Sequence, residues 1–247
     1  MTVTYMVPDQ QSDAVICLLG DPFVLEAGHP HPVPEGCKRL LAFVALKGGR
    51  VDRRHAAGSL WPDGPEGRAS GNLRSALWRL RGAGINVLEA DKVNICLRER
   101  TTTDLDRLCE WADRLVTGAA TEADLHVPEW SSTVAELLPG WYDDWVIFER
   151  ERIRQRMLHA LEALSCRLCA AGRYGEAIEA AMDAVAVEPL RESAQRVLSE
   201  AHLAEGNYIE AQRTFRNYRD LVRAELGVEP SAAFQRRVQA AATSRRP

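Results

Sequence analysis

Residues 68–81 read R-A-S-G-N-L-R-S-A-L-W-R-L-R, and this stretch decides how the N-terminal half is interpreted. Its apolar residues recur at i, i+3, i+4 and i+7, a spacing that predicts an amphipathic helix with one narrow apolar stripe. The stripe consists of Leu73, Ala76, Leu77 and Leu80. The other face carries four arginines, two serines and an asparagine, and it has no acidic residue. An ordinary solvated helix has charges of both signs, so this face favours contact with a polyanion.

The neighbouring segments predict two shorter helices before this stretch and a β-hairpin after it. The first helix covers 37–46, and the second covers 53–61 with Asp52 as its N-cap. The hairpin covers 85–97 and turns at 90–92. Two strand candidates, A-V-I-C-L-L-G and P-F-V-L-E-A, precede the helices. Three helices followed by a hairpin is the order of a winged helix, in which the third helix enters the major groove of DNA.

Charge is distributed unevenly along the chain. The net charge is −4 and the isoelectric point is about 5.9. Residues 35–81 nevertheless hold ten basic and only four acidic side chains. The acidic average therefore hides a basic module, which is typical of a nucleic-acid-binding domain.

The second half of the chain contains a helical repeat. G-R-Y-G-E-A begins at Gly172 and G-N-Y-I-E-A begins at Gly206, an offset of 34 residues. This is the tetratricopeptide spacing, in which a glycine ends one helix and an alanine lets paired helices approach. Further helices are predicted over 105–116 and 147–170. We therefore expect an all-α, tetratricopeptide-like domain.

Several longer motifs resemble those of a known family. R-V-D-R-R-H-A-A-G-S-L-W-P covers 50–62, and the helix at 68–81 follows it. L-L-P-G-W-Y-D-D-W-V covers 137–146, and L-V-R-A-E-L-G-V-E-P-S covers 221–231. The chain is similar to the Streptomyces antibiotic regulatory proteins (SARPs), in which an OmpR-type winged helix precedes a bacterial transcriptional activator domain.

The resemblance implies a DNA-binding transcriptional activator. Members of the family bind short direct repeats in double-stranded promoter DNA and recruit RNA polymerase through its sigma and alpha subunits. They usually control secondary-metabolite gene clusters, such as those for antibiotics. A head-to-tail dimer on DNA is also implied.

Ten residues are expected to contact DNA. The helix at 68–81 would read the major groove, the start of the second helix would contact phosphates, and the hairpin tip would act as the wing. In chain order the ten are Arg53, Arg54, Arg68, Ser70, Asn72, Arg74, Ser75, Arg79, Arg81 and Lys92. Glu89 and Asp91 flank the tip lysine, which departs from more basic wings. Trp78 is expected to pack against the preceding helices rather than against DNA.

These observations predict a mainly helical chain of two domains. The winged-helix DNA-binding domain would cover 13–100 and the activator domain 101–243. Tails at 1–12 and 244–247 are expected to be disordered.

Other functions find less support in the sequence. A scaffold whose helical repeats bind a protein or a ligand, without DNA, is the alternative. An enzyme is not expected, because the sequence has no P-loop and no set of nucleophile, cofactor loop or metal ligands. Cys166 and Cys169 form one C-x-x-C without a second pair, so buried thiols rather than a metal site are expected. No apolar run of 18 residues and no signal peptide is present, so no membrane contact and a cytoplasmic, nucleoid-associated protein are expected.

Overall fold

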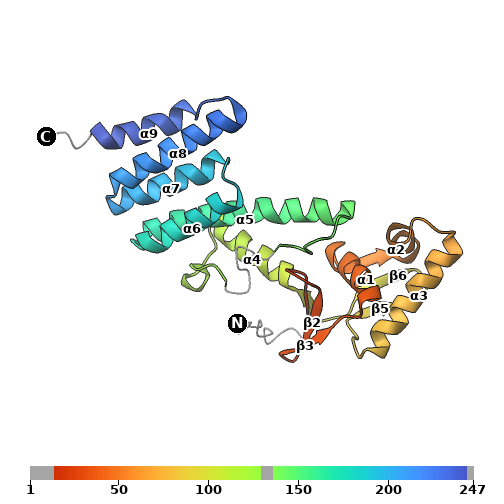
Figure 1. Ribbon diagram of the computed structural model, residues 1–247. Coiled ribbons are helices and arrows are strands. Elements are labelled where there is room, and N and C mark those ends of the chain that lie inside the picture. The colour runs from red at the N-terminus through yellow and green to blue at the C-terminus, as the bar shows by residue number, and fades with distance from the viewer. Residues whose placement is uncertain (1–13, 129–135, 244–247) are drawn as a thin grey trace. The chain divides into compact units, whose positions relative to one another are not determined.

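The computed structural model describes residues 14–128 and 136–243, and Figure 1 shows its helices and strands. Within these residues the chain forms two compact units. Unit 1 contains residues 14–108 and 136–151, and unit 2 contains 109–128 and 152–243. Unit 1 thus includes two segments, 101–108 and 136–151, that were predicted from the sequence to belong to the second domain. The predicted tails at 1–12 and 244–247 lie outside the described residues.

The described residues of unit 1 form three complete helices and two small sheets, and two further helices begin in this unit. The complete helices are α1 (Glu35–Leu46), α2 (Arg53–Leu60) and α3 (Glu66–Gly82). The first sheet has the order β3-β2-β1-β7, with β7 parallel to β1, and the second has the order β4-β6-β5. The strands are β1 (Ala14–Cys17), β2 (Phe23–Glu26), β3 (His29–Pro32), β4 (Arg50–Asp52), β5 (Leu88–Ala90), β6 (Asn94–Leu97) and β7 (Thr101–Thr103).

This arrangement confirms the predicted winged helix. The three expected helices, the hairpin formed by β5 and β6, and the strands β1 and β2 are all present. Strands β3, β4 and β7 were not predicted from the sequence. They are three or four residues long, and each is defined by a partner strand rather than by its own apolar pattern.

A later segment of the chain completes unit 1. The backbone N–H of Leu138 donates to the carbonyl of Leu18, next to an isolated bridge between Leu19 and Leu137. Arg150 donates to the carbonyls of Leu137 and Leu138 at 3.0 and 2.8 Å, and to that of Trp141 at 3.1 Å. We call residues 136–150 the strap. Its Leu138 is fully buried with a left-handed φ of 48°, so the surrounding contacts hold a conformation that leucine rarely adopts.

Unit 2 is helical in its described residues, as the tetratricopeptide-like spacing predicted. Gly172 and Gly206 adopt left-handed backbone conformations, with φ of 75° and 91°, directly after a helix. These turns let consecutive helices pack antiparallel, and α6 (Tyr174–Val187), α7 (Glu192–Glu205) and α8 (Tyr208–Leu226) contact one another in sequence order. The other helices of the second half are, in chain order, α4 (Asp104–Thr117), the short 3₁₀ turn η1 (Glu122–Asp124), α5 (Asp144–Ala170) and α9 (Ala232–Thr243). Helices α4 and α5 both begin in unit 1.

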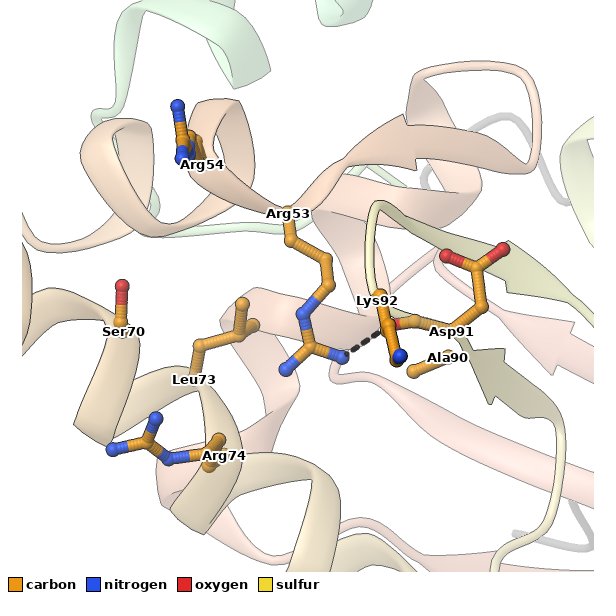
Figure 2. A pocket seen from close by; sticks show the side chains of 8 residues that line it. All are labelled: Arg53, Arg54, Ser70, Leu73, Arg74, Ala90, Asp91 and Lys92. Carbon is orange, nitrogen blue, oxygen red and sulfur yellow. Dashed lines mark hydrogen bonds between the residues drawn. The ribbon is translucent and has the colours of Figure 1, made fainter.

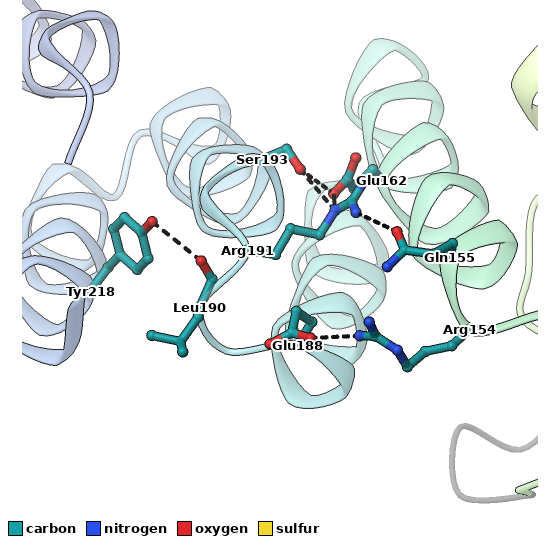
Figure 3. A network of polar contacts seen from close by, with 8 residues as sticks. All are labelled: Arg154, Gln155, Glu162, Glu188, Leu190, Arg191, Ser193 and Tyr218. Carbon is teal, nitrogen blue, oxygen red and sulfur yellow. Dashed lines mark hydrogen bonds and ion pairs between the residues drawn. The ribbon is translucent and has the colours of Figure 1, made fainter. Parts of the chain in front are cut away.

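A polar network fixes the connection between α6 and α7 (Figure 3). Arg191 pairs with Glu162 of α5 at 2.7 Å and also donates to Gln155 at 3.0 Å. Ser193 donates to the same glutamate at 2.6 Å. Because Arg191 and Glu162 are both largely buried, removing either partner would leave the other charge poorly compensated. The network therefore orients the connection relative to α5.

The prediction that Cys166 and Cys169 are both buried thiols is only partly met. Cys166 is exposed on α5 and Cys169 is partly buried, so the expected pair of buried thiols is wrong for Cys166. The reason is helical geometry. Leu164 and Leu168, which are nearly fully buried, define the inward face of this part of α5, and Cys166 lies about 200° around the helix from each of them.

Candidate nucleic-acid interface

The apolar stripe of α3 determines which face of that helix is free. Leu73, Leu77 and Leu80 are at most 8% exposed, and the helix packs against α1 and α2. The predicted stripe is therefore confirmed. Burying one leucine side chain contributes about 1.5–3 kcal/mol, so rotating α3 about its axis would lose several such contributions. The opposite face is held toward solvent.

The outer face of α3 has a crest of small residues and one tryptophan. At about 100° per residue, Gly71, Ser75 and Trp78 lie opposite the leucine stripe. The expectation that Trp78 packs against the preceding helices is wrong, because its side chain is 74% exposed. The physical reason is the rotation of the helix. Leu77 lies at the edge of the stripe, and Trp78, the next residue, is rotated about 100° further around the helix, away from the buried face.

A hollow beside α3 brings together five of the ten predicted residues (Figure 2). It measures about 650 Å³ and lies between the start of α2, the first turns of α3 and the turn between β5 and β6. Its predicted residues are Arg53, Arg54, Ser70, Arg74 and Lys92. Leu73, Ala90 and Asp91 also line it and were not predicted. Four cations from three separate elements thus converge on one concave surface.

The first residues of α2 are held by a cap and by a contact with the wing. Asp52 is the predicted N-cap, and its carboxylate accepts from the backbone N–H groups of Arg54 and His55 at 2.8 and 3.0 Å. The guanidinium of Arg53 donates to the backbone carbonyl of Asp91 at 3.0 Å, as the dashed line in Figure 2 shows. This bond ties the turn of the hairpin to the start of α2. Together with the pairing of β4 and β6, it holds the hairpin against the start of α2.

Both acidic residues that flank the tip of the wing are engaged within the hairpin. The Asp91 carboxylate accepts from the backbone N–H groups of Asn94 and Val93, each at 2.6 Å, and these hydrogen bonds hold its pKa below the usual range. Glu89 pairs with Arg98 at 3.1 Å. In Figure 2 the Asp91 carboxylate lies on the side of the turn away from Arg53. Their charges are therefore partly compensated, and the neighbouring lysine remains exposed.

The other five predicted residues lie outside the hollow. Arg81 follows Arg74 by two turns, so it lies on the same flank of α3, and Ser75 is on the crest. Asn72 and Arg79 are on the opposite flank, with Arg68 at its beginning. Arg79 approaches α1: a Cβ atom added at Gly36 would be 2.6 Å from its Nη1. The predicted residues therefore form two flanks separated by the crest.

Besides Asp91, which lines the hollow, a second acidic side chain lies near it. Glu66 in the first turn of α3 is 3.9 Å from Arg54, and both side chains are more than three quarters exposed. An exposed pair at this distance contributes little, typically under 1 kcal/mol, and is screened by salt. It does not cancel the cationic character of the surface.

The C-terminal half matches a family of regulators. The bacterial transcriptional activator domain matches residues 107–241, which is more than half of the chain. The chain belongs to the bacterial transcriptional activator domain family. This match confirms the resemblance to SARP-type activators that the motifs indicated.

A solved structure has the same fold as this chain. It is Mycobacterium tuberculosis EmbR in complex with a low-affinity phosphopeptide, with a TM-score of 0.71 and 20% sequence identity. The similarity covers 95% of this chain but only 66% of the EmbR chain. At this identity the likeness shows the fold alone. No curated protein matches the chain significantly in sequence.

Among residues 14–128 and 136–243, no group of three or more His, Cys, Asp or Glu side chains is placed to hold a metal ion. No helix in those ranges combines the length and apolar character that crossing a membrane requires.

Proposed function

We propose that the activator binds double-stranded promoter DNA sequence-specifically through α3, α2 and the wing. The observation that carries this proposal is the hollow in which Arg53, Arg54, Arg74 and Lys92 converge beside α3. Phosphates are the ligands that suit such a cluster, because each cation can replace a counterion of the DNA backbone. The hollow would follow one DNA strand while α3 lies in the major groove.

The two flanks of α3 would have different tasks. Arg74 and Arg81, on the flank toward the wing, and Arg79, on the other, can donate bidentate hydrogen bonds to guanine edges or phosphates. Small residues at Gly71 and Ser75 allow the helix backbone to approach the bases. Phosphate contacts fix the position of the protein on DNA, and contacts to base edges select the sequence.

Unit 2 would act on the transcription machinery. Family membership supports a proposal that this unit recruits RNA polymerase through its sigma and alpha subunits. We also propose that two chains bind a direct repeat head to tail, and that the regulated genes form a secondary-metabolite cluster. The protein would act on the nucleoid in the bacterial cytoplasm. No catalytic step is part of this function.

The direct test compares Arg74→Ala with the wild type on promoter fragments and on scrambled DNA at about 150 mM salt. If Arg74 contacts a base, affinity for the specific site should fall about 5- to 150-fold, with a smaller effect on scrambled DNA. If it contacts a phosphate, affinity should fall on all sequences and the salt slope should decrease by about one. Fluorescence anisotropy over a salt series separates these two results.

A matched control is Arg213→Ala, which removes an exposed arginine from α8 in unit 2. It should bind DNA like the wild type. Equal binding of Arg74→Ala and the wild type on every DNA would remove Arg74 from the interface. Absence of specific binding by the folded wild type would contradict the proposal and favour a repeat scaffold that binds a protein or ligand.

A further inference from the structure

Trp78 stands out on the surface of α3 because its large aromatic side chain is 74% exposed. We propose that its indole contacts the C5 methyl group of a thymine in the major groove, which makes Trp78 a specificity-determining residue. This inference rests on the proposed function, because it requires α3 to enter the groove. It goes beyond that function by naming the base that one side chain recognises.

The position of Trp78 on α3 supports this role. It follows Gly71 by seven residues and Ser75 by three, so the three lie along one line on the crest. Glycine and serine extend little from the helix, whereas the indole extends far. If the crest faces the floor of the groove, Trp78 is the crest side chain that reaches deepest among the bases.

The structure gives Trp78 no packing role comparable to that of other tryptophans in the chain. Trp111 is 3% exposed and donates its indole N–H to the carbonyl of Asp124 at 3.0 Å. Trp145 packs edge-on against Phe43, with ring centroids 5.1 Å apart. Trp78 instead leaves most of its apolar surface in water. An exposed aromatic side chain on a cationic face is best accounted for by a surface that covers it.

The chemistry of the groove identifies what Trp78 would cover. In the major groove, base edges present hydrogen-bond donors and acceptors together with one apolar group, the thymine C5 methyl. The arginines beside the crest can satisfy the polar groups. The apolar ring would exclude water from the methyl group, and a cytosine at the same position offers no such group. The inferred preference is therefore for thymine.

The test replaces single thymines by deoxyuridine in a site located by footprinting. Deoxyuridine keeps the pairing with adenine and the O4 acceptor, and it lacks only the methyl group. For the wild type, replacement at one or two thymine positions should lower the binding affinity about fourfold each, the value expected for leaving one methyl-sized group in water. Trp78→Ala should bind with the same affinity whether thymine or deoxyuridine stands at those positions.

Two further variants make the result decisive. Trp78→Phe keeps an aromatic ring and should retain part of the thymine preference. Phe148→Ala removes a side chain that is equally exposed, at 75%, but that lies on α5. Its loss of affinity at each deoxyuridine position should match that of the wild type. The unfolding midpoint of each variant shows that the fold is intact, which an exposed position should preserve.

Each alternative gives a different outcome. If Trp78→Ala weakens binding equally on thymine and deoxyuridine, Trp78 contacts the DNA backbone or a second protein, and the inference is overturned. Identical profiles for Trp78→Ala and the wild type also overturn it, while specific binding by both would leave the proposed function intact. If the folded wild type binds no site specifically, the proposed function itself fails.

Discussion

Replacing Asp104 with asparagine should change how stability depends on pH. Asp104 begins α4 and is 5% exposed. Its Oδ2 accepts from the backbone N–H groups of Leu18 and Leu19 at 2.8 and 2.9 Å. Its Oδ1 is buried without a hydrogen-bond partner among the described residues. Burial disfavours the charged form and raises the pKa to about 6, although the backbone hydrogen bonds oppose this shift.

The sign and size of the effect follow from linkage. Because the pKa is raised from 3.8 to about 6, the folded protein binds the proton more tightly than the unfolded chain does. The contribution of Asp104 to stability is therefore fully present below pH 3.8 and is lost as pH rises through about 6. The full shift corresponds to about 3 kcal/mol. Between pH 5 and pH 8 the expected loss is about 1.4 kcal/mol.

Urea unfolding of the wild type and of Asp104→Asn at several pH values measures this loss. The asparagine carbonyl can still accept from both backbone N–H groups, but the site no longer titrates. At each pH, the unfolding free energy of Asp104→Asn is subtracted from that of the wild type. This difference should fall by about 1.4 kcal/mol from pH 5 to pH 8, because the wild type loses stability over this range. Asp63→Asn, at an exposed turn, controls for the loss of a carboxylate. A pH-independent difference, or a shift of opposite sign, would refute the reasoning.

Two other substitutions test the fold. Arg150→Ala removes the donor for the backbone carbonyls of Leu137 and Leu138, so the free energy of unfolding of unit 1 should fall by about 2–4 kcal/mol. A decrease below about 0.5 kcal/mol in urea unfolding would show that the strap does not depend on Arg150. Gly206→Ala should cost about 1–2 kcal/mol in thermal unfolding, because φ is 91° there. The control Gly175→Ala lies inside α6 with open space at Cβ and should be neutral or slightly stabilising, and equal effects at both glycines would contradict this account.

Features with a local physical cause could be predicted from the sequence alone. The leucine stripe of α3 follows from a spacing within 17 residues, and the cap at Asp52 uses backbone N–H groups only two and three residues further along the chain. The glycines at 172 and 206 repeat because each ends a helix in the same conformation. The cationic character of the outer face of α3 could also be predicted from the sequence, because the helical period alone assigns residues to faces.

The tertiary structure decided which of these residues meet. Arg53, Arg74 and Lys92 come from three elements, and only the packing of α2, α3 and the wing places them around one hollow while Arg79 turns toward α1. Strand β7 exists through its pairing with β1, some 87 residues earlier. The exposure of Trp78 depends on where the other helices leave α3 uncovered. Local sequence sets conformation and amphipathic faces, whereas contacts between distant segments depend on how those faces are buried together.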